Sequence, residues 1–231
     1  ITLFLGLILI ITPMITRTVD GNDTLIGENT YNTKEIAETI SEKGIHGNTI
    51  DIGERTYIIN PYDVLLGHLG KFFPIDILSK ILPVIFGVVS LILLFMIMDG
   101  LGTKSMEKTL MLLMFILSPL FITTFSISSY HSLAIATFLF GCFFFIRGKR
   151  MDLALSVLFF SILPFFGTYE AFLALGSLLA YVAITKTKKR WFAVIFMILL
   201  IIMSGYSFHN ANIPSDIEER ESFGDEDRWK T

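Results

Sequence analysis

The sequence predicts an all-α integral membrane protein with about seven transmembrane helices and a large polar loop after the first of them. Of its 231 residues, 53% are apolar and only 17% are charged, which is too apolar for an ordinary soluble domain. The apolar residues also gather in runs of nearly bilayer-spanning length, and the charged residues lie at the edges of these runs or outside them. The single cysteine, Cys142, lies inside such a run, so no intrachain disulfide is available.

Residues 1–16 form the first apolar run. We interpret it as a transmembrane helix that has lost its start, because it is short and carries neither a basic leader nor a small-residue cleavage site. Residues 17–80 form the polar loop, and residues 81–205 hold the remaining spans. Residues 206–231 are an acidic tail, which we expect to begin a further region.

The loop itself has local patterns of secondary structure. Thr33 to Lys43 places apolar residues at helical spacing before Gly44, which predicts a short amphipathic helix. Tyr62 to Phe73 follows Pro61 and has a broad apolar face, as in a helix that lies along a membrane surface. Thr56 to Ile59 is β-prone and follows turn-forming residues.

Six further apolar runs predict the second to seventh spans. Ser118-Pro119 and Leu163-Pro164 interrupt two of them, and we expect these prolines to kink their helices and open a groove for a lipid carrier. The runs are Ile81 to Met98, Thr109 to Ser126, Leu133 to Ile146, Leu153 to Phe166, Ala171 to Ile184 and Trp191 to Ser204.

Basic residues fall in alternate turns between the spans, which predicts the orientation. By the positive-inside rule these turns face the cytoplasm of a multi-pass protein of the cell membrane. The loop and the tail then lie on the outer face with 17 of the 21 carboxylates. Because the basic residues flank spans, we expect no nucleic-acid partner. They are Lys104, Lys108, Arg147, Lys149, Arg150, Lys186, Lys188, Lys189 and Arg190.

Glu28 is the first candidate for chemistry, because it would be held just above the outer membrane surface. A partly desolvated carboxylate there can act as a general base or hold a divalent cation. The alternative is a solvated loop acid like the nine other carboxylates of the loop.

Read as a whole, the loop resembles the first outer loop of archaeal C-type (GT-C) membrane glycosyltransferases related to the catalytic subunit of oligosaccharyltransferase. In that family the order is Gly-Asp-Ser-Tyr-Tyr-His, a helix, an Asp, Gly-Gly-Arg-x-Tyr and Pro-Pro-Gly-Tyr before leucines. Phe166-Gly167-Thr168-Tyr169 is similar to a later Trp-Gly-Gly-Tyr turn, and the resemblance covers roughly residues 1–205. The matching residues are Gly27-Glu28-Asn29-Thr30-Tyr31-Asn32, Ile36-Ala37, Gly44, Asp51, Gly53-Glu54-Arg55-Thr56-Tyr57, Pro61-Tyr62 and Leu65-Leu66.

The resemblance implies an enzyme that takes a sugar from a polyprenyl phosphate or diphosphate in the membrane. The acceptor would be a protein or glycan at the outer face. Glu28 would be the catalytic base or a metal ligand, with a longer arm than the family's Asp. Arg55 would face the carrier's phosphates, and Tyr31, Asp51 and Tyr57 would help to bind substrate. Without the resemblance, an exposed ion pair of Arg55 with Glu54 or Asp51 explains that arginine as well.

The second outer turn departs from the family. Oligosaccharyltransferases carry an acidic metal-binding motif there, whereas this chain reads Ser129-Tyr130-His131-Ser132. Only His131 could join Glu28 as a ligand, and Mg²⁺ or Mn²⁺ prefer oxygen donors. We therefore expect metal-independent transfer to a hydroxyl ahead of metal-dependent asparagine glycosylation.

Glu170 is the only carboxylate in the short outer turns of spans three to six. An ionisable group at a membrane edge is a candidate for substrate binding, and capping of the following helix explains it equally well.

Two other functions are open. A non-catalytic scaffold or degenerate relative would fit the missing acid of the second turn. A transporter would normally place charged residues within the membrane, and none lies there in the predicted topology.

Overall fold

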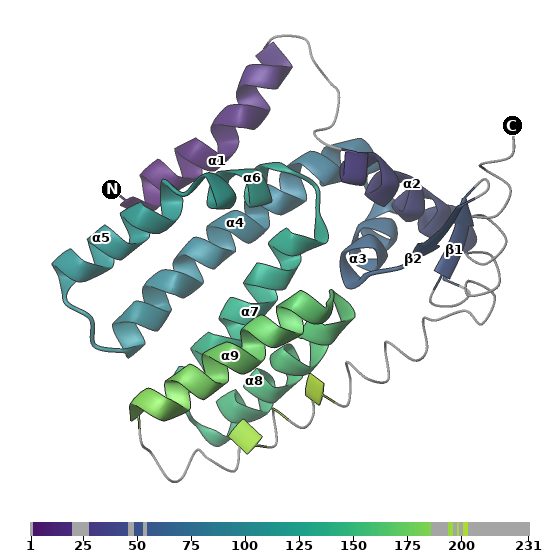
Figure 1. Cartoon of the computed structure of the whole chain (residues 1–231). Helices are drawn as coiled ribbons and strands as arrows, with labels where there is room; N and C mark the ends of the chain where they lie inside the picture. Colours follow the sequence, from purple (N-terminus) through teal and green to yellow (C-terminus); the bar gives the residue numbers. More distant parts are fainter. Residues whose placement is uncertain are drawn as a thin grey trace, which may run out of the picture.

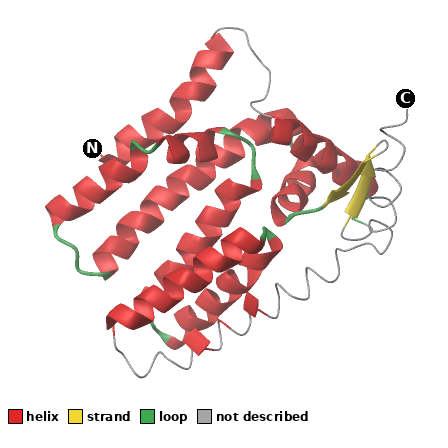
Figure 2. Ribbon diagram, viewed as in Figure 1, coloured by secondary structure: helices red, strands yellow, loops and turns green. Residues whose placement is uncertain are grey.

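The computed structural model describes residues 2–19, 28–45, 49–52 and 55–185, and also 194–195, 198 and 201–202. This part of the chain is mostly helical, as predicted, and its one sheet is a two-stranded hairpin (Figure 2). The elements are α1 (Thr2–Val19), α2 (Glu28–Lys43), β1 (Thr49–Ile52), β2 (Arg55–Ile58), α3 (Pro61–Gly70), α4 (Ile75–Gly100), α5 (Ser105–Ile116), α6 (Pro119–Ser126), α7 (Tyr130–Arg147), α8 (Arg150–Ile162), the 3₁₀ turn η1 (Leu163–Phe165) and α9 (Thr168–Thr185).

Helix α4 lies at the centre of the arrangement (Figure 1). On one side it packs with α1, α5 and α6 around buried Ile10, Leu91, Ile116 and Phe125. On the other side it packs against α7, which in turn packs against α8, η1 and α9 around Phe160 and other buried residues. The helices α2 and α3 with the hairpin form a separate group at one end, which we call the loop unit.

Two helices among the described residues, α4 and α7, are long and apolar enough to cross a membrane. A third span is formed if α5 and α6 are counted together, although they bend by 61°. The bend lies at Ser118-Pro119, where a kink was predicted, because Pro119 lacks the amide proton that would continue the hydrogen bonding of α5. The helices are compatible with a membrane protein, and the count of seven spans stays a prediction.

Several predicted boundaries differ from those observed. The helix of the second span begins at Ile75 and not at Ile81, because Pro74 starts it and Asp76 in its first turn pairs with Lys34 of α2 at 2.6 Å. Pro164 does not kink a continuous helix but lies in η1, where α8 ends. Most of the predicted seventh span and the whole tail lie outside the described residues.

Both helices predicted in the loop are present with other bounds, and the one predicted to lie along a membrane surface packs against protein. Helix α2 begins at Glu28, five positions before the predicted Thr33, and α3 ends at Gly70, before the predicted Phe73. A Cβ on Gly67 would lie 3.0 Å from the carbonyl oxygen of Ala37, so glycine allows α3 to pack directly against α2. Tyr62 and Leu66 of α3 are fully buried between α2, α4 and α7, so this face is covered by protein.

Helices α4 and α7 end on the same side of the molecule. A Cβ on Gly100, the last residue of α4, would lie 3.0 Å from Ile146 near the end of α7. Near the other ends of the two helices, Leu82 and Tyr130 contact the core of the loop unit. The basic turns after α4 and α7 therefore lie opposite the loop unit.

Candidate functional site

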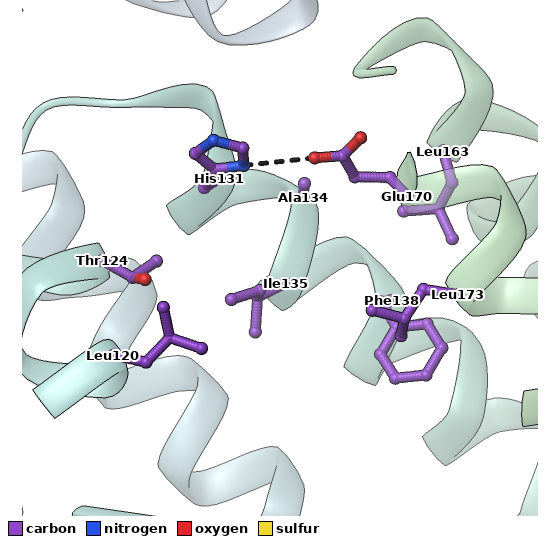
Figure 3. A pocket seen from close by; sticks show the side chains of 9 residues that line it. All are labelled: Leu120, Thr124, His131, Ala134, Ile135, Phe138, Leu163, Glu170 and Leu173. Atoms are coloured by element: carbon purple, nitrogen blue, oxygen red, sulfur yellow. Dashed lines mark hydrogen bonds and ion pairs between the residues drawn. The ribbon is translucent and has the colours of Figure 1, made fainter. Parts of the chain in front are cut away.

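His131 and Glu170, which are 39 residues apart in the sequence, face each other across the ends of α7 and α9. His131 Nδ1 and Glu170 Oε1 are 3.1 Å apart (Figure 3). The side chain of His131 is half exposed, whereas that of Glu170 is 11% exposed. A buried carboxylate therefore orients an imidazole that a ligand can reach.

The N-terminus of α7 fixes the backbone of His131. The side chain of Ser129 caps the helix by accepting a hydrogen bond from the His131 amide at 3.4 Å. Ser132 returns a hydrogen bond from its hydroxyl to the Ser129 carbonyl at 2.9 Å. The rings of Tyr130 and His131 lie 4.1 Å apart between their centroids. These contacts restrict the imidazole independently of Glu170.

The pair has the proton arrangement of a general base when Nδ1 donates to the carboxylate. Nε2 then carries the lone pair, and in Figure 3 this nitrogen lies on the side of the ring away from Glu170. A carboxylate that accepts from Nδ1 fixes the tautomer and stabilises the imidazolium that forms when Nε2 takes up a proton. The arrangement can therefore remove a proton from a hydroxyl bound beside His131.

An apolar pocket of about 280 Å³ extends from the pair between α6, α7 and α9. His131 and Glu170 lie at one end of it, and the rest of its wall is almost entirely apolar (Figure 3). Leu120 directly follows Pro119, and Leu163 directly precedes Pro164, so the pocket borders both predicted proline breaks. A pocket therefore lies where the groove was predicted, although only Pro119 lies at a bend between two helices, and its use by a lipid carrier stays a prediction. Its apolar wall includes Leu120, Ile135, Phe138, Leu163 and Leu173.

A buried polar contact joins the loop unit to the turn before α7. Tyr62 Oη and Ser128 Oγ are hydrogen-bonded at 2.8 Å, and both side chains are buried. Thr30, in the first turn of α2, donates from its hydroxyl to the Ser128 carbonyl at 3.3 Å. The start of α2, where Glu28 lies, is thereby held against the turn that leads to His131.

Asp63 is a second buried ionisable group of the loop unit. Its carboxylate accepts from the Asn60 amide at 3.2 Å and completes the cap of α3, while Asn60 Oδ1 accepts from the amides of Tyr62 and Asp63. Burial raises the pKa of Asp63 to about 7, against the opposing effect of its hydrogen bonds with Asn60 and Thr33. Its other oxygen, Oδ1, has no hydrogen-bond partner among the described residues.

The other residues predicted from the sequence are spread over the loop unit. The side chains of Glu28 and Arg55 lie outside the described part, although their backbones begin α2 and β2. Tyr31 is exposed on α2. Asp51 accepts from the Thr56 hydroxyl at 2.7 Å across the hairpin, and Tyr57 packs against the core of Ile36, Ile40 and Ile59. Figure 1 shows the hairpin at the edge of the molecule, with α2 and α3 between it and α7.

The donor set for a metal is small. Among the described residues, no group of three or more His, Cys, Asp or Glu side chains comes together. His131 and Glu170 supply two donors, and the predicted ligand Glu28 would be a third. A Mg²⁺ or Mn²⁺ ion would need further oxygen ligands from a substrate phosphate or water.

Tyr62, Ser128 and Asp63 were not predicted as functional residues. Tyr62 was expected as part of an apolar helix and of the Pro61-Tyr62 match to the family, without a role of its own, and Ser128 as one of several serines in a turn. A phenol directly after Pro61 on a helix with a broad apolar face is a signal that a polar partner is required when that face is buried.

Comparisons with protein families, with curated proteins and with solved structures found no match to this chain. The fold and the site therefore define it only as a mostly helical chain with two or three helices that could cross a membrane. Its distinguishing feature is an apolar pocket with a His-Glu pair at one end.

Proposed function

We propose that the chain is a membrane glycosyltransferase of the C type, with about seven spans, that takes a sugar or oligosaccharide from a polyprenyl-phosphate carrier. The acceptor is a hydroxyl of a protein or glycan at the outer face of the membrane. The observation that carries this proposal is the His131–Glu170 pair at the end of the apolar pocket. The resemblance of the loop to such enzymes gives independent support.

The pocket has the properties needed for the chain of the carrier. Its wall is apolar and includes Leu120, which is 72% exposed, so the cavity is reached from the surface that α6 presents to lipid. An isoprenoid chain entering there from the bilayer would exchange contacts with lipid for contacts with these apolar side chains and leave its phosphate near His131.

The polar end of the pocket favours an anion beside it. The first turns of α7 and α9 meet there through His131 and Glu170, and the first turn of α2 is bonded to Ser128 just before α7. Helix N-termini carry partial positive charge, which stabilises a phosphate. Glu170 adds negative charge that opposes an anion while His131 is neutral, and this charge is offset once His131 takes up the proton, when the leaving phosphate gains its charge.

The transfer needs one proton to move. As the acceptor oxygen bonds to the anomeric carbon, the bond from that carbon to the carrier's phosphate oxygen breaks, and the polyprenyl phosphate leaves with the electron pair. The proton of the acceptor hydroxyl goes to Nε2 of His131, and Glu170 stabilises the resulting imidazolium. Release of that proton to solvent restores the base. Glu28, at the start of α2, stays a second candidate for the base or for a ligand of Mg²⁺ or Mn²⁺.

The position of the charged turns supports the proposed orientation. Lys104 and Lys108 follow α4, Arg147 and Lys149 follow or end α7, and both turns lie opposite the loop unit. With these turns in the cytoplasm, the pair, the loop unit and the acceptor are at the outer face.

The test is transfer from a radiolabelled polyprenyl-phosphate sugar in proteoliposomes. We expect His131→Ala to lower transfer about a hundredfold or more, because a positioned general base contributes roughly that factor. His68→Ala is the control, since His68 is exposed on α3 and, among the described residues, bonds to the Val64 carbonyl of its own helix. The same sugar on a phosphate without the lipid chain should be a poor donor.

Loss of activity in both histidine variants, or none in either, would contradict the assigned base. Substrate flux into vesicles without a glycosylated product would favour a transporter. Binding of a partner by a chain that never transfers sugar would favour a scaffold.

A further inference from the structure

Tyr62 combines complete burial with a single specific polar contact. Its side chain is 0% exposed, and its ring packs edge-on against Phe86 of α4 at 6.4 Å between centroids. Burial raises the pKa of its phenol, so the hydroxyl stays protonated. The hydroxyl is hydrogen-bonded to Ser128, which is 66 positions away in the sequence. Packing alone would be served by phenylalanine, so the hydroxyl needs another explanation.

Ser128 is part of the short connection between α6 and α7. It is 3% exposed. Its hydroxyl is hydrogen-bonded to Tyr62 and its carbonyl to Thr30, and both of these residues belong to the loop unit. The next residue, Ser129, caps α7 and holds the amide of His131. A displacement of Ser128 would therefore be passed to the first turn of α7 through one peptide unit and one cap.

We propose that Tyr62 is a positioning residue for His131: its hydrogen bond to Ser128 fixes the turn before α7 so that the imidazole faces Glu170. Tyr62 does not touch the pocket and acts only through the turn. The loop unit and the pair are thereby coupled, because the pair is aligned only when α3 is docked against α4 and α7. The role in catalysis rests on the proposed function, whereas the effect on the His131–Glu170 contact does not.

The direct test is ¹⁵N NMR of histidine-labelled protein in detergent micelles. The signals of His131, one of four histidines, are assigned by their absence in His131→Gln. In the unchanged protein we expect a single tautomer with the proton on Nδ1. In Tyr62→Phe, which keeps the ring, and in Ser128→Ala, we expect exchange between two tautomers, because Nδ1 loses its fixed partner. Ser177→Ala is the control, since its hydroxyl bonds only to Leu173 within α9.

A second readout separates positioning from general damage. If the chain transfers sugar, we expect Tyr62→Phe and Ser128→Ala to lower kcat about tenfold, the factor that corresponds to one hydrogen bond, with little change in KM for the donor. In a His131→Ala background Tyr62→Phe should have no further effect on kcat, because the group that it positions is absent.

The inference is overturned if the His131 signals of both variants match those of the unchanged protein and of Ser177→Ala. It is also overturned if Tyr62→Phe lowers kcat equally with and without His131. If Tyr62→Phe does not fold, the NMR result for Ser128→Ala decides. Should the unchanged protein transfer no sugar, the proposed function fails, while the NMR comparison still decides whether Tyr62 positions His131.

Discussion

The two polar regions near the predicted outer face differ in the number of charges and in what the charges contact. The loop from residue 17 to 80 contains ten carboxylates, but those described are mostly exposed or satisfied locally. Lys34 pairs with Asp76 and Glu38, and Asp51 bonds to Thr56 within the hairpin. The short turns contribute only His131 and Glu170, which contact each other beside a pocket.

The difference shows that side chains brought together by the fold locate a site better than the number of charged residues does. Exposed ion pairs such as Lys34 with Glu38 contribute little free energy and orient nothing, because water competes for both partners. Glu170 is largely buried and has an imidazole as its partner, so its contact restricts a group that can react. The loop unit supports the site through the hydrogen bonds of Tyr62 and Thr30 to Ser128.

The largest expected effect tests which region holds the essential acid. We expect Glu170→Gln to lower transfer about a hundredfold, because the neutral amide can no longer stabilise the imidazolium. The resemblance predicts a similar loss for Glu28→Gln. Glu35→Gln, at an exposed position on α2, is the control for both. The measurement is the initial rate of sugar transfer in proteoliposomes.

Equal activity in Glu28→Gln and Glu35→Gln would show that Glu28 has no role in transfer. The His131–Glu170 pair would then be the remaining candidate for the base. Full activity in Glu170→Gln, with loss in Glu28→Gln, would mean that the essential acid lies in the loop and not in the His131–Glu170 pair.

Stability against pH should separate the two regions next, because Asp63 is the buried acid of the loop unit. Its folded pKa of about 7 lies above the 3.8 of an exposed Asp, so the folded state binds more protons between these values. The contribution of Asp63 to stability is therefore greatest below about pH 4, falls as pH rises from there to about 7, and is constant above that. Asp63→Asn keeps an oxygen for the Asn60 amide without the charge, so we expect it to abolish this fall.

The measurement is the thermal unfolding midpoint of the purified protein at pH 5 and pH 8. We expect the unchanged protein to lose stability relative to the variant between pH 5 and pH 8, by on the order of 2 kcal/mol, because about two pH units of the titration window lie above pH 5. Glu42→Gln, at an exposed position near the end of α2, is the control. An unchanged pH dependence in Asp63→Asn would show that another group titrates.

Local sequence patterns predicted much of the helical structure. The apolar runs located α4 and α7, and Ser118-Pro119 located the bend between α5 and α6. The start of α4 was missed because Asp76 and Lys80 have the composition of a loop, although Asp76 has a partner on α2. One strand of the hairpin was predicted from its β-prone residues. Its partner, Thr49–Ile52, was not, because pairing depends on the turn between them.

The site was predicted as separate residues but not as a pair. His131 was considered as a metal ligand because the resemblance places the family's metal motif in its turn, and Glu170 as a substrate contact or helix cap because of its position at a membrane edge. Their contact depends on how α9 returns past η1 to lie beside α7, which no spacing in the sequence encodes. The bond between Tyr62 and Ser128 likewise depends on docking of α3 against α7.

The smallest expected effect comes from a change at Gly167 that alters only the pair. A Cβ at this position would lie 2.6 Å from Glu170 Oε2, and apart from the Glu170 carboxyl group it would meet nothing outside its chain neighbours. The end of a glutamate side chain can rotate at little cost, so Gly167→Ala should turn the carboxylate away from His131 without loosening the fold. We expect transfer to fall severalfold, toward the value of Glu170→Gln, and the unfolding midpoint to stay nearly unchanged.

Gly176→Ala, within the helix α9 that follows Gly167, is the matched control, because a Cβ there would meet no atom of the described residues within 4 Å. It should leave transfer as it is and raise stability by up to about 1 kcal/mol, the amount by which alanine favours a helix interior over glycine. A fall in transfer for Gly167→Ala with the control unchanged would show that the direction of one carboxylate matters. Equal transfer in the two variants would mean that Glu170 acts only by capping α9, and the comparison between the loop and the pair would then lose its chemical basis.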